Sequence, residues 1–449
     1  MARAVLHIGT EKTGTTTLQK HLLLNDAALA KGRWRYPYLG GGPAHTALAV
    51  CAADSDADVF DLDGLSGRVP GEERSAFVAR IDAALSAEVR AHPKARFLLS
   101  TEHAHSRLVS DHAVDRLKTM LKRHFSTVDV IVYLRRWDRA AVAAHATAVV
   151  NGAVEAFDFA DYLGKPYLDY SSLLDRWARA FGDKRLRVAV FDRAELKGGS
   201  IVDDFVHRLR LPALAPVGDT NVSPPSATIE LIRRINPQLS LQSPRTAAMV
   251  REALATDAPR LLTRTPMLPS RTAARRFVRL HKRQAEIVRQ RFLPDRATVF
   301  DDDFGSYPKE EAAFILSPDV LAATMAAALS GVVERSRMIA GELHYYRARM
   351  HLDHGRPALA RDEIDSALLA APGDAAHHHV SALVDIALGR VDQAKHAIDV
   401  AIAIDPDNMA HHAVAARIIG HAPGLQPVAE VASKPQWPNK PPSKRSRRS

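Results

Sequence analysis

The first residues able to do chemistry lie within residues 5–18, VLHIGTEKTGTTTL. An apolar run precedes Gly9, a polar segment follows it, and helix-forming residues begin at Leu18. This order predicts a strand, a glycine loop and a helix N-terminus, where backbone N–H groups and the helix dipole favour an anion. Glycine permits close backbone approach, and hydroxyls add donors. The predicted phosphate-binding residues are Gly9, Lys12, Thr13, Gly14, Thr15 and Thr16. A glycine turn without a ligand is the alternative.

The spacing of this loop differs from that of the ATPase type. A Walker loop, GxxxxGK[ST], carries its lysine directly after the second glycine, whereas Thr15 stands there and the lysine is Lys12. No acidic magnesium ligand is apparent in the sequence. The pattern GxxKTGTT resembles the 5′-phosphosulfate loop of the sulfotransferases that use 3′-phosphoadenosine 5′-phosphosulfate (PAPS), especially their bacterial branch. The resemblance implies that PAPS is the co-substrate, that no metal is needed, and that Lys12 neutralises charge on the bridging oxygen as the product PAP leaves.

The resemblance covers roughly residues 1–308 and includes a second landmark, a strand that ends in arginine. Here an apolar strand ends at Arg135, which the resemblance places on the 3′-phosphate of PAPS. A guanidinium can hold phosphate bidentately, although a surface ion pair is the other interpretation. Eight residues on, Ala143 stands where the family usually has serine. The basic residues that could replace this serine are Arg136, Arg139 and His145.

A transfer to a hydroxyl needs a base, and the family places one after the strand that precedes the arginine strand. Glu102 matches that position, and His103 is beside it. Ligands and catalytic groups collect at the carboxyl ends of parallel strands, so Gly9, Glu102 and Arg135 are expected to converge. The other interpretation of Glu102 is an acidic residue at a helix start, favoured by the helix dipole.

Two weaker matches extend the resemblance. Related enzymes place an aromatic residue near the adenine at the position of Phe191, although a core residue is the other interpretation. Residues 221–223, Asn-Val-Ser, also fit the bacterial branch. The 21 histidines invite a metal interpretation, most obviously at His103-Ala104-His105 and in residues 377–379. The triple histidine lacks a cysteine or acidic partner at ligand spacing, so we predict no metal site.

The alternation of strand and helix patterns predicts an α/β fold with a parallel, P-loop-type sheet flanked by helices. Near-continuous apolar strands, such as residues 128–134, fit a sheet covered on both faces. The expected strands are residues 3–8, 34–37, 95–101, 128–134, 185–191 and 297–300. The expected helices are residues 15–25, 74–91, 111–124, 138–150, 170–182, 200–209, 226–236 and 272–292.

From residue 318 to residue 420 the sequence becomes rich in alanine and histidine and predicts helices throughout. Several residue types recur there at a period of 34, which resembles tetratricopeptide repeats. The recurring pairs are Gly355 and Gly389, Ala360 and Ala394, Ile364 and Ile398, Ala367 and Ala401, and Pro372 and Pro406. We expect repeats at 341–374 and 375–408, with helices at 318–338 and 409–420 as caps. The repeats would bind a protein partner; helical hairpins without a partner are the alternative.

Composition and charge limit the remaining function classes. Of the net charge of +10, the basic residues after Glu430 supply six, which leaves about +4 for the rest and gives no indication of nucleic-acid binding. Residues 423–449 are rich in proline, serine and basic residues and should form a disordered tail. A single cysteine, Cys51, suits a reducing compartment, and no membrane span or signal peptide is apparent, so we expect a cytoplasmic protein.

These observations predict a PAPS-dependent sulfotransferase domain at 1–310, a helical-repeat domain at 318–420 and a basic tail at 423–449. As the resemblance implies, the enzyme would move a sulfuryl group to an acceptor hydroxyl, for which a carbohydrate is our hypothesis. Glu102 would take the acceptor's proton, and Lys12 would assist departure of PAP. Two alternatives remain: a P-loop kinase that acts on a small molecule and requires magnesium, and an inactive sulfotransferase-like scaffold.

Overall fold

The computed structural model describes residues 2–69, 71–217, 224–257, 269–310, 318–406 and 408–419. The predictions for residues 221–223 and for the tail at 423–449 therefore lie outside the described residues. The chain divides into two compact units, Met1–Ala328 and Leu329–Ser449, which are described separately. Among the helices described here, none is long and apolar enough to cross a membrane.

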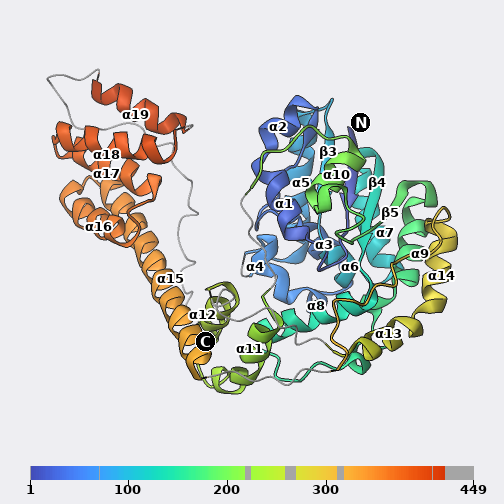
Figure 1. The fold of residues 1–449 in the computed structure, drawn as a ribbon. Helices are drawn as coiled ribbons and strands as arrows, with labels where there is room; N and C mark the ends of the chain where they lie inside the picture. Colours follow the sequence, from blue (N-terminus) through green and yellow to red (C-terminus); the bar gives the residue numbers. More distant parts are fainter. Residues whose placement is uncertain are drawn as a thin grey trace, which may run out of the picture. The chain divides into compact units, whose positions relative to one another are not determined.

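The first unit is built on a parallel sheet of five strands in the order β2-β3-β1-β4-β5 (Figure 1). The strands are β1 Ala2–His7, β2 Trp34–Arg35, β3 Arg96–Ser100, β4 Phe125–Leu134 and β5 Leu186–Val190. In the register, Leu6 of β1 lies beside Leu99 of β3 and Val130 of β4. The α/β fold with a parallel sheet is confirmed. Because β1 is central, the segment that follows it lies between the ends of β3 and β4.

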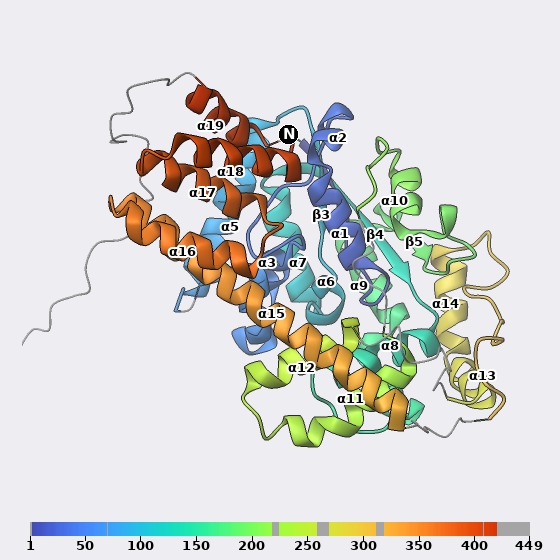
Figure 2. The same ribbon diagram turned by 60° about the vertical axis from the view of Figure 1, so that its left-hand side comes forward.

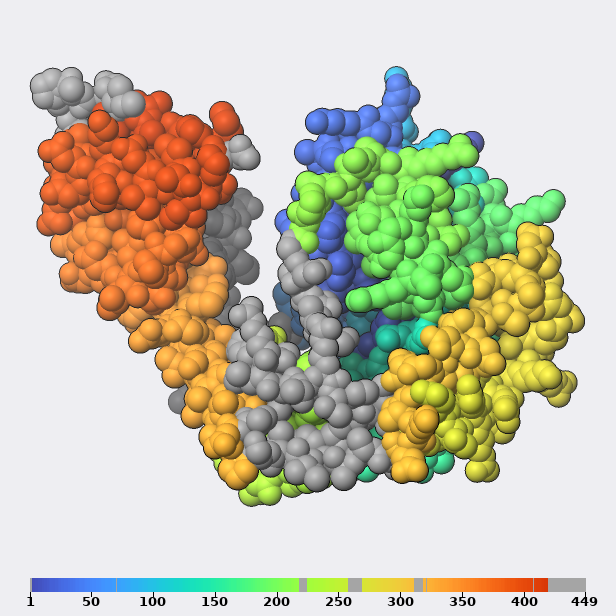
Figure 3. Space-filling view, viewed as in Figure 1, coloured from blue at the N-terminus to red at the C-terminus, as the bar shows by residue number. Residues whose placement is uncertain are grey.

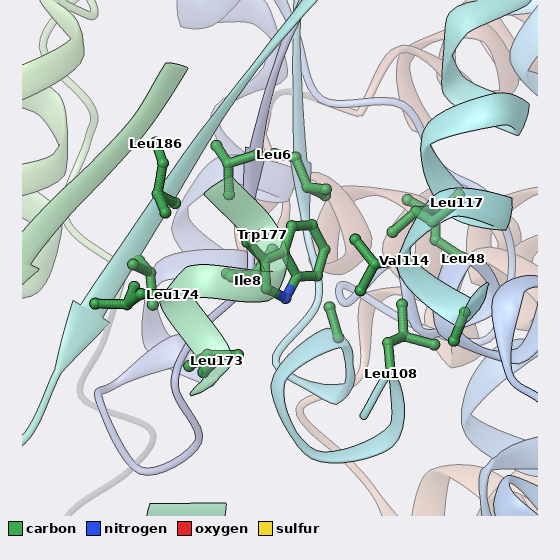
Figure 4. Close-up of a cluster of buried hydrophobic side chains, with 14 of the residues drawn as sticks. Leu6, Ile8, Leu48, Leu108, Val114, Leu117, Leu173, Leu174, Trp177 and Leu186 are labelled. Carbon is green, nitrogen blue, oxygen red and sulfur yellow. The ribbon is translucent and has the colours of Figure 1, made fainter. Parts of the chain in front are cut away.

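Both faces of the sheet are buried, as the apolar strands predicted. Successive residues of β1 point to opposite faces: Leu6 belongs to one core cluster and Val5 to the other. In the larger cluster, Trp177 packs among leucines from the sheet and the helices beside it (Figure 4). This apolar packing helps to hold the strands that carry the site in place.

Helices cover the sheet. The helices of the first unit are α1 Thr15–Leu24, α2 Asp26–Lys31, α3 Thr46–Ala52, α4 Asp63–Ser66, α5 Arg74–Ala91, α6 His103–Arg107, α7 Asp111–Lys122, α8 Trp137–Val150, α9 Tyr170–Phe181, α10 Ile201–Leu209, α11 Ser226–Leu239, α12 Pro244–Asp257, α13 Arg271–Leu280 and α14 Lys282–Phe292. Short 3-10 turns occur at Asp56–Asp58, Phe60–Leu62, Phe159–Tyr162, Pro166–Leu168, Asp183–Arg185 and Lys197–Gly199. The residues of α1 and α10 pack together, and Figure 3 shows the green surface of α10 beside the blue surface of the first helices.

Two predicted elements of this unit were wrong. Residues 297–300 form no strand; instead Phe300 packs edge-on against Trp137, with ring centroids 5.0 Å apart. The long helix expected at 272–292 is interrupted at His281, which separates α13 from α14. The His281 ring stacks on Trp137 at 5.1 Å, and its Nδ1 contacts the Phe277 carbonyl at 3.0 Å. In both places, packing around a buried tryptophan replaces the regular structure that the local pattern favoured.

The second unit is helical. Its helices are α15 Pro318–Asp353, which begins before the unit boundary, α16 Pro357–Ala370, α17 Ala375–Ala387, α18 Val391–Ile404 and α19 Met409–Ile419. Figure 2 shows α16 to α19 stacked one after another. The sequence analysis divided α15 into a cap at 318–338 and the start of a repeat at 341, but α15 runs through both without a break.

Equivalent positions of this unit have equivalent surroundings. Gly355 follows α15 and Gly389 follows α17, with φ of 66° and 73°, a conformation that glycine adopts without strain. The paired Ala360 and Ala394 are both fully buried. Interhelical ring contacts also repeat: Tyr345 lies 5.2 Å from His377, and His379 lies 4.9 Å from His411. Each contact is thus reproduced 34 residues later, as a repeating architecture requires.

Candidate functional site

The segment between β1 and α1 is tied to the end of β4. Backbone N–H and Oγ1 of Thr10 both donate to the Tyr133 carbonyl, at 2.9 and 3.0 Å, and the Tyr133 N–H donates to the Gly9 carbonyl at 2.7 Å. The loop therefore begins from a fixed position at the carboxyl edge of the sheet, where ligands collect in open α/β folds.

Three residues of the loop adopt positive φ: Gly9 at 90°, Lys12 at 63° and Gly14 at 74°. Gly9 also meets a steric limit, because a Cβ atom there would lie 3.2 Å from both Cα and Cβ of Glu102. The glycine predicted to permit close approach thus brings the loop directly against the predicted base. Gly9 and Glu102, as expected from the sheet, come together.

The backbone N–H groups of the loop and of the first helical turn are free to bind an anion. The first intrahelical bond of α1 runs from the Leu18 N–H to the Gly14 carbonyl at 3.1 Å. Within the described part of the chain, the N–H groups of residues 12–17 have no protein acceptor, and the first turn of α1 carries no acidic residue. Unpaired donors and the positive end of the helix dipole coincide here.

The threonines of the loop differ in the hydrogen-bonding groups that they leave for a ligand. The buried Thr13 directs its hydroxyl to the Thr10 carbonyl at 2.5 Å, so its backbone N–H is the group left for a ligand. Thr15 is buried, whereas Thr16 is half-buried at the helix start. No ion pair of Lys12 is found among the described residues, so its ammonium is available to an anion.

Arg135 reaches the loop from the end of β4. Its Nη1 donates to the Lys12 carbonyl at 2.6 Å, and its guanidinium lies 5.7 Å from the centre of the Phe191 ring. Burial lowers the pKa of this guanidinium, and no carboxylate of the described residues pairs with it. Arg135 is partly buried, and removing a cation from water without a counter-charge is costly, so it is suited to an anionic ligand. Phe191 also contacts the position a Cβ on Gly14 would occupy, at 3.6 Å.

The neighbouring basic residues are already committed. Arg136 is buried and bonded to both carboxylate oxygens of Asp138 at 2.8 Å, and it reaches Asp301 at 2.7 Å. Arg139 pairs with Asp192 and lies 3.6 Å from Asp301. These arginines connect structural segments, so neither is a free substitute for the serine absent at position 143. His145 packs edge-on against Phe157 at 5.3 Å.

Glu102 follows β3 and precedes α6. Its Oε2 accepts a hydrogen bond of 2.6 Å from Nε2 of Gln19, a residue of α1. The same Gln19 nitrogen donates to Oγ of Ser100 at 3.2 Å, and that Oγ lies 2.8 Å from Nδ1 of His7. Gln19, Ser100 and His7 form a buried polar network behind Glu102 that the sequence analysis missed. No signal in the sequence connects Gln19 to Glu102, because the two residues lie 83 positions apart and meet only through tertiary packing.

The two histidines near Glu102 are placed differently. His105 is buried between the Glu11 N–H, which donates to its Nδ1 at 3.4 Å, and the Tyr167 carbonyl at 3.0 Å from its Nε2. Burial lowers its pKa, so His105 is neutral near pH 7 and acts as a structural support of the loop. His103 is half-buried, with an Nδ1 that has no partner among the described residues.

The described residues contain no group of three or more histidine, cysteine, aspartate or glutamate side chains arranged to hold a metal ion. Comparison with protein-family models gives no match, and comparison with curated proteins gives none either. What the geometry brings together is a set of unpaired amides, an unpaired lysine, a partly buried arginine and a carboxylate. Such a set can bind a dianionic group and accept a proton beside it.

Proposed function

We propose that this protein is a PAPS-dependent sulfotransferase that moves a sulfuryl group to an acceptor hydroxyl. The observation that carries the proposal is the partly buried, carboxylate-free guanidinium of Arg135, bonded to the carbonyl of Lys12 beside the unpaired amides of residues 12–17. Lys12 with the loop amides, and Arg135, offer two sets of donors to a ligand with two anionic ends. The resemblance of the GxxKTGTT loop supplies the identity of that ligand.

In the proposed reaction, the amides of residues 12–17 bind the 5′-phosphosulfate and Arg135 binds the 3′-phosphate. Phe191, which lies beside both Gly14 and Arg135, contacts the adenine in this proposal. Glu102 takes the proton of the acceptor hydroxyl as its oxygen forms a bond to sulfur. The bond from sulfur to the bridging oxygen breaks, and Lys12 stabilises the charge that develops there. The sulfuryl group carries less charge than a phosphoryl group, so positioning and these side chains can suffice.

Calorimetry with PAP tests the binding half of the proposal. The wild-type chain should bind PAP, and Arg135→Met should weaken binding by about 10²-fold, the scale of one lost charged hydrogen-bond partner. Arg136 is unsuitable as a control because it holds Asp138 and Asp301 together. The exposed Arg276 of α13 is suitable, and Arg276→Met should leave affinity unchanged. Absence of PAP binding by the wild type would exclude the proposal.

Transfer from radiolabelled PAPS to glycan, lipid and phenol acceptors tests the reaction half. Carbohydrate acceptors are our hypothesis, and transfer should persist with a metal chelator. Turnover of ATP that depends on magnesium would favour a P-loop kinase instead. PAP binding without transfer to any acceptor would favour an inactive scaffold, for which Ala143 in place of the family's serine is the best support.

The repeated helices of the second unit are proposed to bind a protein partner in the manner of tetratricopeptide repeats. The reproduction of buried alanines and ring contacts at a period of 34 supports this. Truncation after about residue 312 should leave PAP affinity within a few-fold of wild type. A soluble truncated chain that cannot bind PAP would show that the two parts form one folding unit.

A further inference from the structure

The hydrogen bond between Gln19 and Glu102 joins the predicted base to the helix that begins the anion loop. Gln19 is 1% exposed and lies on α1, and its Nε2 is 2.6 Å from Oε2 of Glu102. A carboxylate accepts hydrogen bonds only, so the amide nitrogen must be the atom that faces it. The second proton of that nitrogen is directed to Oγ of Ser100 at 3.2 Å. Both donors of Gln19 are therefore used, and its orientation is determined.

Two titratable groups face Glu102 from neighbouring elements and are neutral near pH 7. They are His7, at the end of β1, and Tyr36, which follows β2. Burial lowers the pKa of His7 to about 4, and burial raises the pKa of Tyr36 well above its ordinary value. No arginine or lysine among the described residues pairs with Glu102. Gln19 is thus a neutral donor to a carboxylate that lacks a cationic partner.

Helix α1 also links the contact between Gln19 and Glu102 to the anion-binding loop. Thr15 and Gln19 are four residues apart, which places them on one face of the helix. Thr15 stands at the first turn, where the unpaired amides are, and both side chains are buried. A rigid helical turn rises about 5.4 Å, so it sets the separation between the anion-binding end and the group that holds Glu102.

We propose that Gln19 is a positioning residue that turns the second carboxylate oxygen of Glu102 toward the acceptor. This rests on the proposed function, because it assigns Glu102 the role of base. The donation to Oε2 fixes the plane of the carboxylate, which leaves Oε1 to take the proton. The same helix binds the donor's anionic end, so base and sulfuryl group are positioned by one element. Gln19 itself touches neither substrate.

The first test is Gln19→Met, which keeps side-chain length and removes both hydrogen bonds. We expect kcat to fall by about 10- to 100-fold, as when a residue that orients a functional group is lost, with PAP affinity within a few-fold of wild type. The matched control is Gln290→Met, because Nε2 of Gln290 also donates to a carboxylate, Glu286, at 2.7 Å on the exposed side of α14. That variant should retain full activity.

The second test is Gln19→Glu, which places a second carboxyl group at Glu102. Two adjacent carboxyl groups resist joint ionisation, so the acid limb of the pH–rate profile should move up by at least about 1 pH unit. A purely structural role of Gln19 would lower the melting temperature without moving this limb. Both variants are first shown to bind PAP, which establishes that the site is folded.

The outcomes separate this proposal from the proposed function. If the wild type neither binds PAP nor transfers sulfate, the function itself is wrong. If the wild type is active while Gln19→Met keeps its kcat and Gln19→Glu keeps the wild-type pH profile, only the role of Gln19 is wrong. A lower kcat in Gln19→Met together with a shifted acid limb in Gln19→Glu supports it.

Discussion

Two partly buried arginines, one in each unit, have opposite surroundings. In the second unit, Arg361 of α16 donates to Asp385 of α17 at 3.0 Å and also pairs with Asp365. In the first unit, Arg135 has a backbone carbonyl and an aromatic ring beside it, with no carboxylate among the described residues. The charge of Arg361 is neutralised by carboxylates of the chain itself. The charge of Arg135 has no carboxylate partner among the described residues. The difference indicates where the molecule is arranged for an anionic ligand rather than for its own packing.

The largest expected effect concerns the carboxylate of the strand-end site. Glu102→Gln should reduce sulfate transfer by about 10²- to 10⁴-fold, because the acceptor would lose its general base. PAP affinity should stay within a few-fold, since the amides and Arg135 are unchanged. Rates are measured with radiolabelled PAPS at saturating acceptor.

The adjacent His103→Ala is the control for this prediction. The His103 side chain is half-buried and makes no hydrogen bond to Glu102. We expect His103→Ala to change the rate far less than Glu102→Gln. An essential His103 beside a dispensable Glu102 would reverse the assignment of the base.

The next effect concerns Lys12. Lys12→Ala should lose about 10²- to 10³-fold in rate, the size found for one lost transition-state donor. In the proposed mechanism the ammonium would act on charge that develops as PAP leaves, so kcat should fall more than PAP affinity. Single-turnover kinetics separate these quantities. Turnover close to that of wild type would remove Lys12 from the mechanism.

The loop and the strand ends could be predicted from sequence because they depend on local order. An apolar run followed by glycine determines where β1 ends, and the match of Glu102 and Arg135 to strand ends follows from the parallel sheet. The residues with which each arginine pairs could not be predicted in this way. Arg135 and Arg136 are adjacent residues of the same type, yet only Arg136 binds Asp301, which lies far along the chain.

The same limit explains the polar network behind the base. In the sequence, Gln19 is an ordinary helix residue. Its contact with Glu102 exists only because α1 packs beside the end of β3. The break at His281 likewise depends on Trp137, which no local pattern connects to it. Positions set by tertiary packing therefore lay beyond the sequence analysis, whereas elements set by periodicity did not.

The comparison of the two arginines can be tested by replacing each with methionine. Arg361→Met leaves Asp385 buried without a cation and should destabilise the helical unit by about 3 kcal/mol. Arg135→Met removes an uncompensated cation and one hydrogen bond, so its cost should be within about 1 kcal/mol. Hydrogen exchange of α16 and α17 amides measures the first, and urea unfolding followed by tryptophan fluorescence measures the second. Equal losses would mean that Arg135 is structural as well.

The last prediction is a dependence of stability on pH that arises behind the site. Burial lowers the pKa of His7 and of His45 from 6.5 to about 4. In the unfolded chain both histidines take up protons below about pH 6.5, whereas the folded chain resists protonation until about pH 4. Stability is therefore fully present above pH 6.5 and falls as the pH drops toward 4.

Between pH 7 and pH 5 this loss should be about 2 kcal/mol for each histidine. His45→Gln should remove about half of the pH dependence, since His7 remains. His112→Gln, at an exposed position of α7, should change nothing and serves as the control. Urea unfolding at the two pH values, followed by tryptophan fluorescence, measures the difference. Equal stability of the wild type at pH 5 and pH 7 would contradict the prediction, because two buried neutral histidines must be protonated when this unit unfolds in acid.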